Sequence, residues 1–129
     1  MDERVTLADL KEAVREMCIC RGWGDENAVQ NPQQMAMAMA VELGEMMEHF
    51  AWLSPEDVQA LIDGGMPKRR DMIAEELCDV MIYGIQIMRA LNVDISDGLL
   101  RKIDIVKQRA VDPDAGRHHP HVDVQQLEG

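Results

Sequence analysis

Two acidic pairs recur at a spacing that places both side chains of a pair on one face of a helix. Glu42 and Glu45 are three residues apart, and Glu76 and Asp79 repeat this spacing further along the chain. Most of their neighbours are apolar, so both segments are expected to form helices that are buried on most sides. Ionised carboxylates are unstable in such surroundings unless a cation accompanies them. Too few Lys or Arg residues lie within these segments to supply it, whereas a hard divalent cation such as Mg²⁺ prefers oxygen ligands.

The ordinary alternative is that the acidic pairs line a solvated helix face, as most such pairs do. Here no Lys or Arg stands within one helical turn of either pair, so the like charges would repel each other. The metal-site interpretation is therefore favoured. Magnesium would also allow a chain of net charge −11 to hold a polyphosphate.

Polar and aromatic residues continue from these pairs along the predicted helices. Tyr83 and Gln86 extend the line of Asp79, and Trp52 lies two helical turns beyond Glu45. A stacking ring and hydrogen-bonding groups beside a metal would suit a nucleotide base. The alternative, that the Tyr and Trp are ordinary core residues with one solvated end, stays open.

The elements that must position these residues are all predicted to be helices. Four aromatic residues against eleven Met in 129 residues favour helix over sheet. Capping residues are expected at Thr6, Ser54 and Ser96, and a helix-initiating proline at position 32. Together with glycine and asparagine stops, they predict helices over about 7–21, 32–52, 55–62, 69–91 and 97–109. The fold class is therefore all-α, a bundle of four or five helices over residues 1–111, followed by an irregular tail over 112–129.

Charge and composition exclude several kinds of partner. The short run Lys68–Arg70 is too small a basic surface for a nucleic-acid backbone, so no polymeric nucleic acid is expected. No apolar run reaches membrane length and no signal peptide is recognisable. Three cysteines within apolar helical patterns indicate reduced thiols, and we expect a cytoplasmic protein. The histidines of the tail are interpreted as an adventitious metal binder at most.

Other catalytic motifs are missing from the sequence. It contains no glycine-rich phosphate loop, nucleophile elbow or HExxH motif. A di-iron bundle would need Glu-x-x-His pairs, but His49 follows Glu45 by four residues and Glu48 by one. A non-catalytic, oligomeric helical module that binds metal for regulation remains the alternative to an enzyme.

At these residues the sequence resembles the MazG-like all-α NTP pyrophosphohydrolases, especially their short single-domain dCTP pyrophosphatase branch. The two acidic pairs match the family signature, ExxE followed downstream by ExxD. The likeness covers roughly residues 5 to 110, and further matches follow in order at Trp52, Tyr83 and Lys102.

The resemblance implies hydrolysis of a (d)NTP to the monophosphate and pyrophosphate. It implies Mg²⁺ as the cofactor, with Mn²⁺ as a possible substitute, and a homo-oligomer that is either a dimer or a tetramer. The implied metal ligands are Glu42, Glu45, Glu76 and Asp79. Glu45 would also orient or deprotonate the attacking water.

The resemblance also implies a nucleotide pocket. Trp23, Trp52 and Tyr83 would line the base and sugar, while Lys102 and Arg109 would contact phosphates. Two departures concern base preference. Val106 stands where the family often has Asn, and Val14 stands where dCTP-preferring members carry His. Phosphoribosyl-ATP pyrophosphohydrolase is a further possibility within the superfamily.

Overall fold

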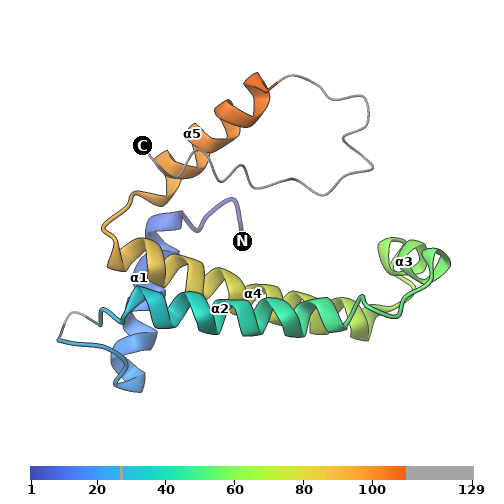
Figure 1. The fold of residues 1–129 in the computed structure, drawn as a ribbon, viewed down its shortest axis with the longest axis horizontal. Coiled ribbons are helices and arrows are strands. Elements are labelled where there is room, and N and C mark those ends of the chain that lie inside the picture. The colour runs from blue at the N-terminus through green and yellow to red at the C-terminus, as the bar shows by residue number, and fades with distance from the viewer. Residues whose placement is uncertain (27, 110–129) are drawn as a thin grey trace. The chain divides into compact units, whose positions relative to one another are not determined.

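The computed structural model describes residues 1–26 and 28–109, and this part of the chain consists of helices and connecting loops without strands (Figure 1). The all-α prediction is confirmed, with five helices in the described residues. No described helix is both long and apolar enough to cross a membrane. The helices are α1 (Leu7–Arg21), α2 (Pro32–Glu48), α3 (Pro55–Ile62), α4 (Pro67–Ala90) and α5 (Ile95–Gln108).

The chain divides into two units. Met1–Gly98 form the first, which contains α1 to α4 and both acidic pairs, and the second begins at Leu99 inside α5. The predicted tail over 112–129 lies outside the described residues, so the boundary after residue 111 stays a prediction.

Helix α1 begins and ends as its sequence predicts. The Thr6 hydroxyl accepts a hydrogen bond from the Asp9 backbone N–H at 3.2 Å, and the Thr6 N–H donates to the Asp9 carboxylate at 2.8 Å. This reciprocal capping box satisfies two backbone N–H donors at the start of the helix. Gly22 ends the helix in the left-handed region at φ 67°, a conformation that glycine adopts without steric cost.

Helix α2 ends at Glu48, so the prediction that it continues to residue 52 was wrong. Residues beyond it form turns, with the Leu53 N–H donating to the Phe50 carbonyl at 3.0 Å. Helix α2 cannot continue to residue 52 because the chain must prepare the start of α3. Ser54 caps α3 in an extended conformation directly ahead of Pro55. Trp52 therefore lies in a connecting loop.

The starts of α4 and α5 also differ from the prediction. Helix α4 begins at Pro67, two residues early, because proline is well suited to a first helical position. Ser96 does not cap α5. Asp94 does so instead, since its carboxylate accepts a hydrogen bond from the Asp97 N–H at 2.8 Å.

Helices α2 and α4 pack along each other, and α1 packs against α4 (Figure 1). A cluster of Val14, Cys18 and Ala28 forms the core on the α1 side, with Ile82 and Ile85 of α4 against it. On the α2 side, Gly84 lies beside a Met of α2: a Cβ added at Gly84 would lie 3.7 Å from the terminal methyl of that Met, an ordinary van der Waals contact. The described core is small. Its buried apolar residues are Val14, Cys18, Ala28, Met35 and Val80.

Candidate metal centre

The pairing of α2 with α4 brings three carboxylates from two helices together. One carboxylate oxygen each of Glu42, Glu45 and Glu76 lie within 4.8 Å of one another. Glu42 and Glu76 are partly buried, while Glu45 is exposed. Helical spacing alone places each acidic pair on one face, but only the packing of the two helices joins the pairs into one cluster.

Asp79 is outside this closest group and is exposed. Its charge nevertheless acts on the cluster, because it is one of the neighbours that raise the pKa of Glu42. The structure thus places Asp79 beside three converging carboxylates, and its role as a fourth ligand stays a prediction.

The cluster is electrostatically unfavourable without a cation. Burial raises the pKa of Glu42 first, and the charges of Glu45, Asp79 and Glu76 raise it further. A hydrogen bond between the Glu42 and Glu45 carboxyl groups acts in the same direction. In the part of the chain that the structure describes, no Lys or Arg forms an ion pair with these four groups.

These observations fit a hard divalent cation. All the converging donors are carboxylate oxygens, the ligand type that Mg²⁺ selects. A divalent cation would remove the repulsion that raises the pKa of Glu42 and would leave coordination positions for phosphate oxygens. Glu42, Glu45 and Glu76 are therefore the residues that could hold it.

The chain matches the model of the MazG-like family over residues 37–119. It belongs to the MazG-like family. The match contains most of α2 and all of α3, α4 and α5, and with them both acidic pairs. The family resemblance inferred from the residues is thereby confirmed.

Curated relatives agree with this placement. The chain is 31% identical over 104 residues to dCTP pyrophosphatase 1 of Rattus norvegicus, and equally to that of Mus musculus and of Homo sapiens. Each alignment covers 81% of this chain and 58% of the relative. This MazG-like chain therefore spans less than two thirds of the length of the relatives it matches.

The predicted base-binding residues lie on three different elements. Tyr83 is partly buried on α4, one turn beyond Asp79. Trp52 is 94% exposed in the loop after α2. Trp23 lies just beyond α1, where the Arg21 guanidinium stands 5.4 Å from the centre of its ring. These three separate positions leave the role of the rings a prediction.

The predicted phosphate contacts are in the second unit. Lys102 lies within α5 and Arg109 directly follows that helix; both are exposed. Lys107, one turn beyond Asp104, approaches its carboxylate at 3.8 Å. The phosphate role of Lys102 and Arg109 also stays a prediction.

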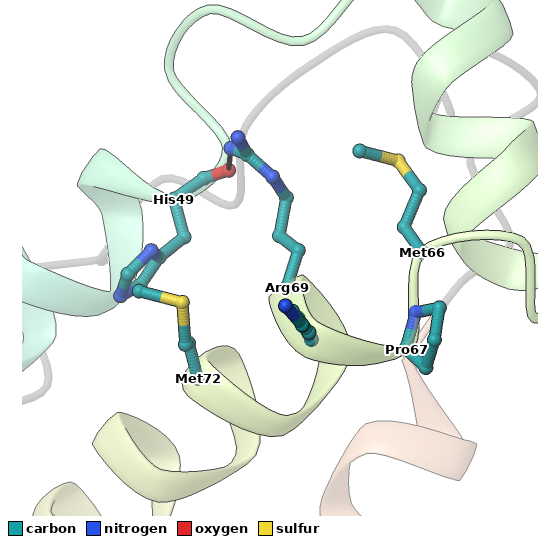
Figure 2. Close-up of a pocket in the computed structure, with 6 residues that line it drawn as sticks. His49, Met66, Pro67, Arg69 and Met72 are labelled. Atoms are coloured by element: carbon teal, nitrogen blue, oxygen red, sulfur yellow. Dashed lines mark hydrogen bonds between the residues drawn. The ribbon is translucent and has the colours of Figure 1, made fainter.

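A hollow beside the cluster combines His49, which continues the polar line from Glu45 toward Trp52, with residues for which the sequence predicted no role at a nucleotide site. It has a volume of about 450 Å³ and is lined by His49, Met66, Pro67, Lys68, Arg69 and Met72 (Figure 2). His49 links it to the carboxylates, because its Nε2 atom lies 3.6 Å from a carboxylate oxygen of Glu76. The available signal was the basic run Lys68–Arg70, which precedes the second acidic pair on the same helix.

Proposed function

We propose that this chain is a Mg²⁺-dependent nucleoside triphosphate pyrophosphohydrolase that converts a (d)NTP to the (d)NMP and pyrophosphate, with Mn²⁺ as a possible substitute. The observation that carries the proposal is the convergence of Glu42, Glu45 and Glu76 from two packed helices. The names of the relatives, dCTP pyrophosphatase 1, support cleavage between the α- and β-phosphates. Asp79 completes the proposed ligand set.

The reaction needs a nucleophile, a proton acceptor and charge neutralisation. A water oxygen bonds to the α-phosphorus while the bond from that phosphorus to the α,β-bridging oxygen breaks, and pyrophosphate leaves with the electron pair. Bound Mg²⁺ supplies charge neutralisation at the phosphates and activation of water. Glu45 orients the water and accepts its proton, which then passes to solvent. Its exposure suits this role, because the other two members of the cluster are partly buried.

The nucleoside is proposed to lie against Trp23, Trp52 and Tyr83, with Lys102 and Arg109 as further phosphate contacts. Val14, which stands at the position of the histidine of dCTP-preferring members, is buried against α4. An apolar side chain there offers no hydrogen bond to a base edge. The base preference is therefore proposed to differ from that of the dCTP-selective relatives, and every common base belongs in the substrate test.

The proposed active form is a homo-oligomer, either a dimer or a tetramer. Few apolar residues are buried within the described chain, whereas helix α2 leaves large apolar side chains in solvent: Met37 at 69%, Val41 at 60% and Met47 at 59% exposure. A second copy would cover such a surface. Light scattering after size exclusion should give a multiple of the 14.6 kDa chain mass, and Val41→Glu should reduce it.

The free thiols of Cys20 and Cys78, both exposed, are compatible with the reducing cytoplasm as the proposed location.

Incubation of the purified protein with Mg²⁺ and each common (d)NTP tests the proposed activity, with the products separated by ion exchange. Monophosphate and pyrophosphate should form, and both EDTA and Glu45→Gln should reduce the rate by about a hundredfold or more. Glu48→Gln is the matched control, because Glu48 is exposed on the same helix outside the cluster. Diphosphate and orthophosphate would mean that a different bond is cut. No turnover of any nucleotide would favour the non-catalytic metal-binding module.

A further inference from the structure

The hollow at the start of α4 concentrates positive charge in a strongly acidic chain. Lys68 and Arg69 carry this charge among its six lining residues, which also include His49, while the chain as a whole carries a net charge of −11. The remaining lining residues are Met66, Pro67 and Met72, which offer no acceptor side chain apart from weak thioether sulfur. The hollow therefore suits an anion that brings its own oxygen acceptors.

The two cations of the hollow differ in what they already bind. Arg69 donates from Nη1 to the backbone carbonyl of His49 at 2.8 Å, a neutral acceptor that leaves the guanidinium charge in place (Figure 2). The charge of Arg69 also helps to lower the pKa of Asp57, so Arg69 has one distant acidic neighbour. Lys68 has no hydrogen bond or ion pair among the described residues, whereas the next arginine, Arg70, pairs with Asp71 at 2.7 Å.

The hollow and the carboxylate cluster adjoin. His49 lines the hollow and places its Nε2 atom 3.6 Å from Glu76. Arg69 and Glu76 are seven residues apart on α4, which puts them on the same helix face at a separation of about 10 Å along the axis. A triphosphate bound at the carboxylates can span this distance when a long basic side chain reaches toward its terminal phosphates. No side chain caps the first turn of α4, so the backbone N–H groups there are available to an anion.

We propose that this hollow receives the β- and γ-phosphates of the triphosphate whose α-phosphate lies at Glu42, Glu45 and Glu76. The inference rests on the proposed function and assigns the substrate a direction along α4. The part that leaves as pyrophosphate points toward the beginning of the helix. Lys68 and Arg69 donate charge-assisted hydrogen bonds to the terminal phosphate oxygens.

Lys68→Gln provides the cleanest test, because its side chain holds nothing else in the described structure. Binding of Mg²⁺-tripolyphosphate, measured by calorimetry, should weaken about tenfold, the loss expected for one charge-assisted hydrogen bond. The affinity for the nucleoside monophosphate should stay unchanged. Arg70→Gln is the matched control, and it should leave both affinities unchanged since Arg70 lies outside the hollow. Lys68→Arg should restore tripolyphosphate binding.

The outcomes separate this inference from the proposed function. If the parent hydrolyses (d)NTP but Lys68→Gln and Arg70→Gln behave alike, the phosphate hollow is wrong and the proposed function stands. If the parent hydrolyses no nucleotide yet binds tripolyphosphate in a Lys68-dependent way, the function is wrong and the anion site stands. If neither turnover nor Lys68-dependent binding is seen, both are wrong. Circular dichroism of each variant identifies any loss of binding that comes from unfolding.

Discussion

The Arg69 guanidinium donates from Nη1 to the backbone carbonyl of His49 at 2.8 Å, and this bond joins the first turn of α4 to the C-cap residue of α2. The carbonyls of the last helical turn have no partner within their own helix. A positive group there also interacts favourably with the negative end of the helix dipole. The bond thus fixes the two helices next to the carboxylates that they jointly supply.

Removing this bond should loosen the helix pair. We expect Arg69→Gln to lower the free energy of unfolding by about 1–3 kcal/mol, because a partly buried carbonyl loses a charged donor. Urea denaturation of the metal-free protein measures the change. Arg70→Gln and Lys68→Gln, which alter neighbouring exposed side chains, should stay within about 0.5 kcal/mol of the parent. An equal loss in all three variants would mean that net charge, and not the bond to His49, is responsible.

The carboxylate cluster should destabilise the metal-free protein. Because burial and three neighbouring acids raise the pKa of Glu42, Glu42→Gln removes a repulsive charge and should raise the melting temperature in EDTA. The same substitution should reduce the rise in melting temperature that Mg²⁺ gives to the parent. Differential scanning fluorimetry with and without Mg²⁺ measures both effects. Glu48→Gln should change neither, and a parent protein that is indifferent to Mg²⁺ would contradict the metal site.

Helix capping should give the fold an acid-sensitive component. Hydrogen bonds from the Ser54 backbone and side chain lower the pKa of Asp57 below its ordinary value of 3.8, and Arg69 contributes to a lesser extent. A carboxyl group with a lowered pKa in the folded state stabilises the fold above its ordinary pKa. This stabilisation is lost as the pH falls through the lowered value.

We therefore expect Asp57→Asn to be less stable than the parent at pH 7, with the difference shrinking as the pH falls below about 4. Urea denaturation at a series of pH values measures it. The Asp9 carboxyl group, whose pKa the Thr6 hydrogen bonds lower, should behave in the same way, so Asp9→Asn is an independent repeat. A difference that persists unchanged at the acid end would mean that the Asp57 charge does not act through the cap.

Local signals predicted most of the helices, and long-range contacts decided what they missed. Thr6, Ser54 and Pro32 mark helix starts correctly because a cap or a proline acts within one turn of its own position. The end of α2 was misplaced by four residues, because it depends on the extended approach to Pro55 and on a donor from α4, twenty residues away. Local sequence could not indicate that contact.

The candidate site divides in the same way. Spacing placed each of the two acidic pairs on one helix face, since side chains three apart are neighbours on any helix. Spacing does not predict that Glu76 joins the first pair while Asp79 lies outside the closest group. Both results depend on how α4 is rotated about its axis against α2. The hollow at Lys68 was missed for a related reason, since its lining comes from the end of one helix and the start of another.

Gln86 is a buried polar residue with an unpaired amide oxygen in the described structure. Its side chain is 3% exposed, and its Oε1 atom has no hydrogen-bond partner among the described residues. Burying an unpaired amide oxygen costs about 1–3 kcal/mol, so Gln86→Met, which has a similar shape, should raise the free energy of unfolding by about 1 kcal/mol or more. Urea denaturation of the metal-free protein tests this. A loss of stability would mean that the amide has a partner in the assembled protein.

Trp52 should report nucleotide binding directly, because its ring is 94% exposed three residues beyond His49. In a Trp23→Phe protein, Trp52 is the sole tryptophan. The Phe ring at position 23 can still form the cation–π contact with the Arg21 guanidinium. Addition of a Mg²⁺-bound α,β-imido nucleoside triphosphate should shift its fluorescence emission to shorter wavelength. Stacking on a base is worth about 1–3 kcal/mol, so Trp52→Ala should weaken binding of the analogue by about fivefold or more.

Mg²⁺-tripolyphosphate is the matched control, since it offers phosphates without a base. It should leave the Trp52 emission unchanged even while it occupies the carboxylates and the Lys68 hollow. An equal spectral shift with tripolyphosphate would mean that Trp52 responds to a rearrangement of the loop between α2 and α3 and does not stack on the base. No shift with any nucleotide, together with unaltered affinity in Trp52→Ala, would remove Trp52 from the nucleotide pocket and leave Tyr83 and Trp23 as its proposed aromatic residues.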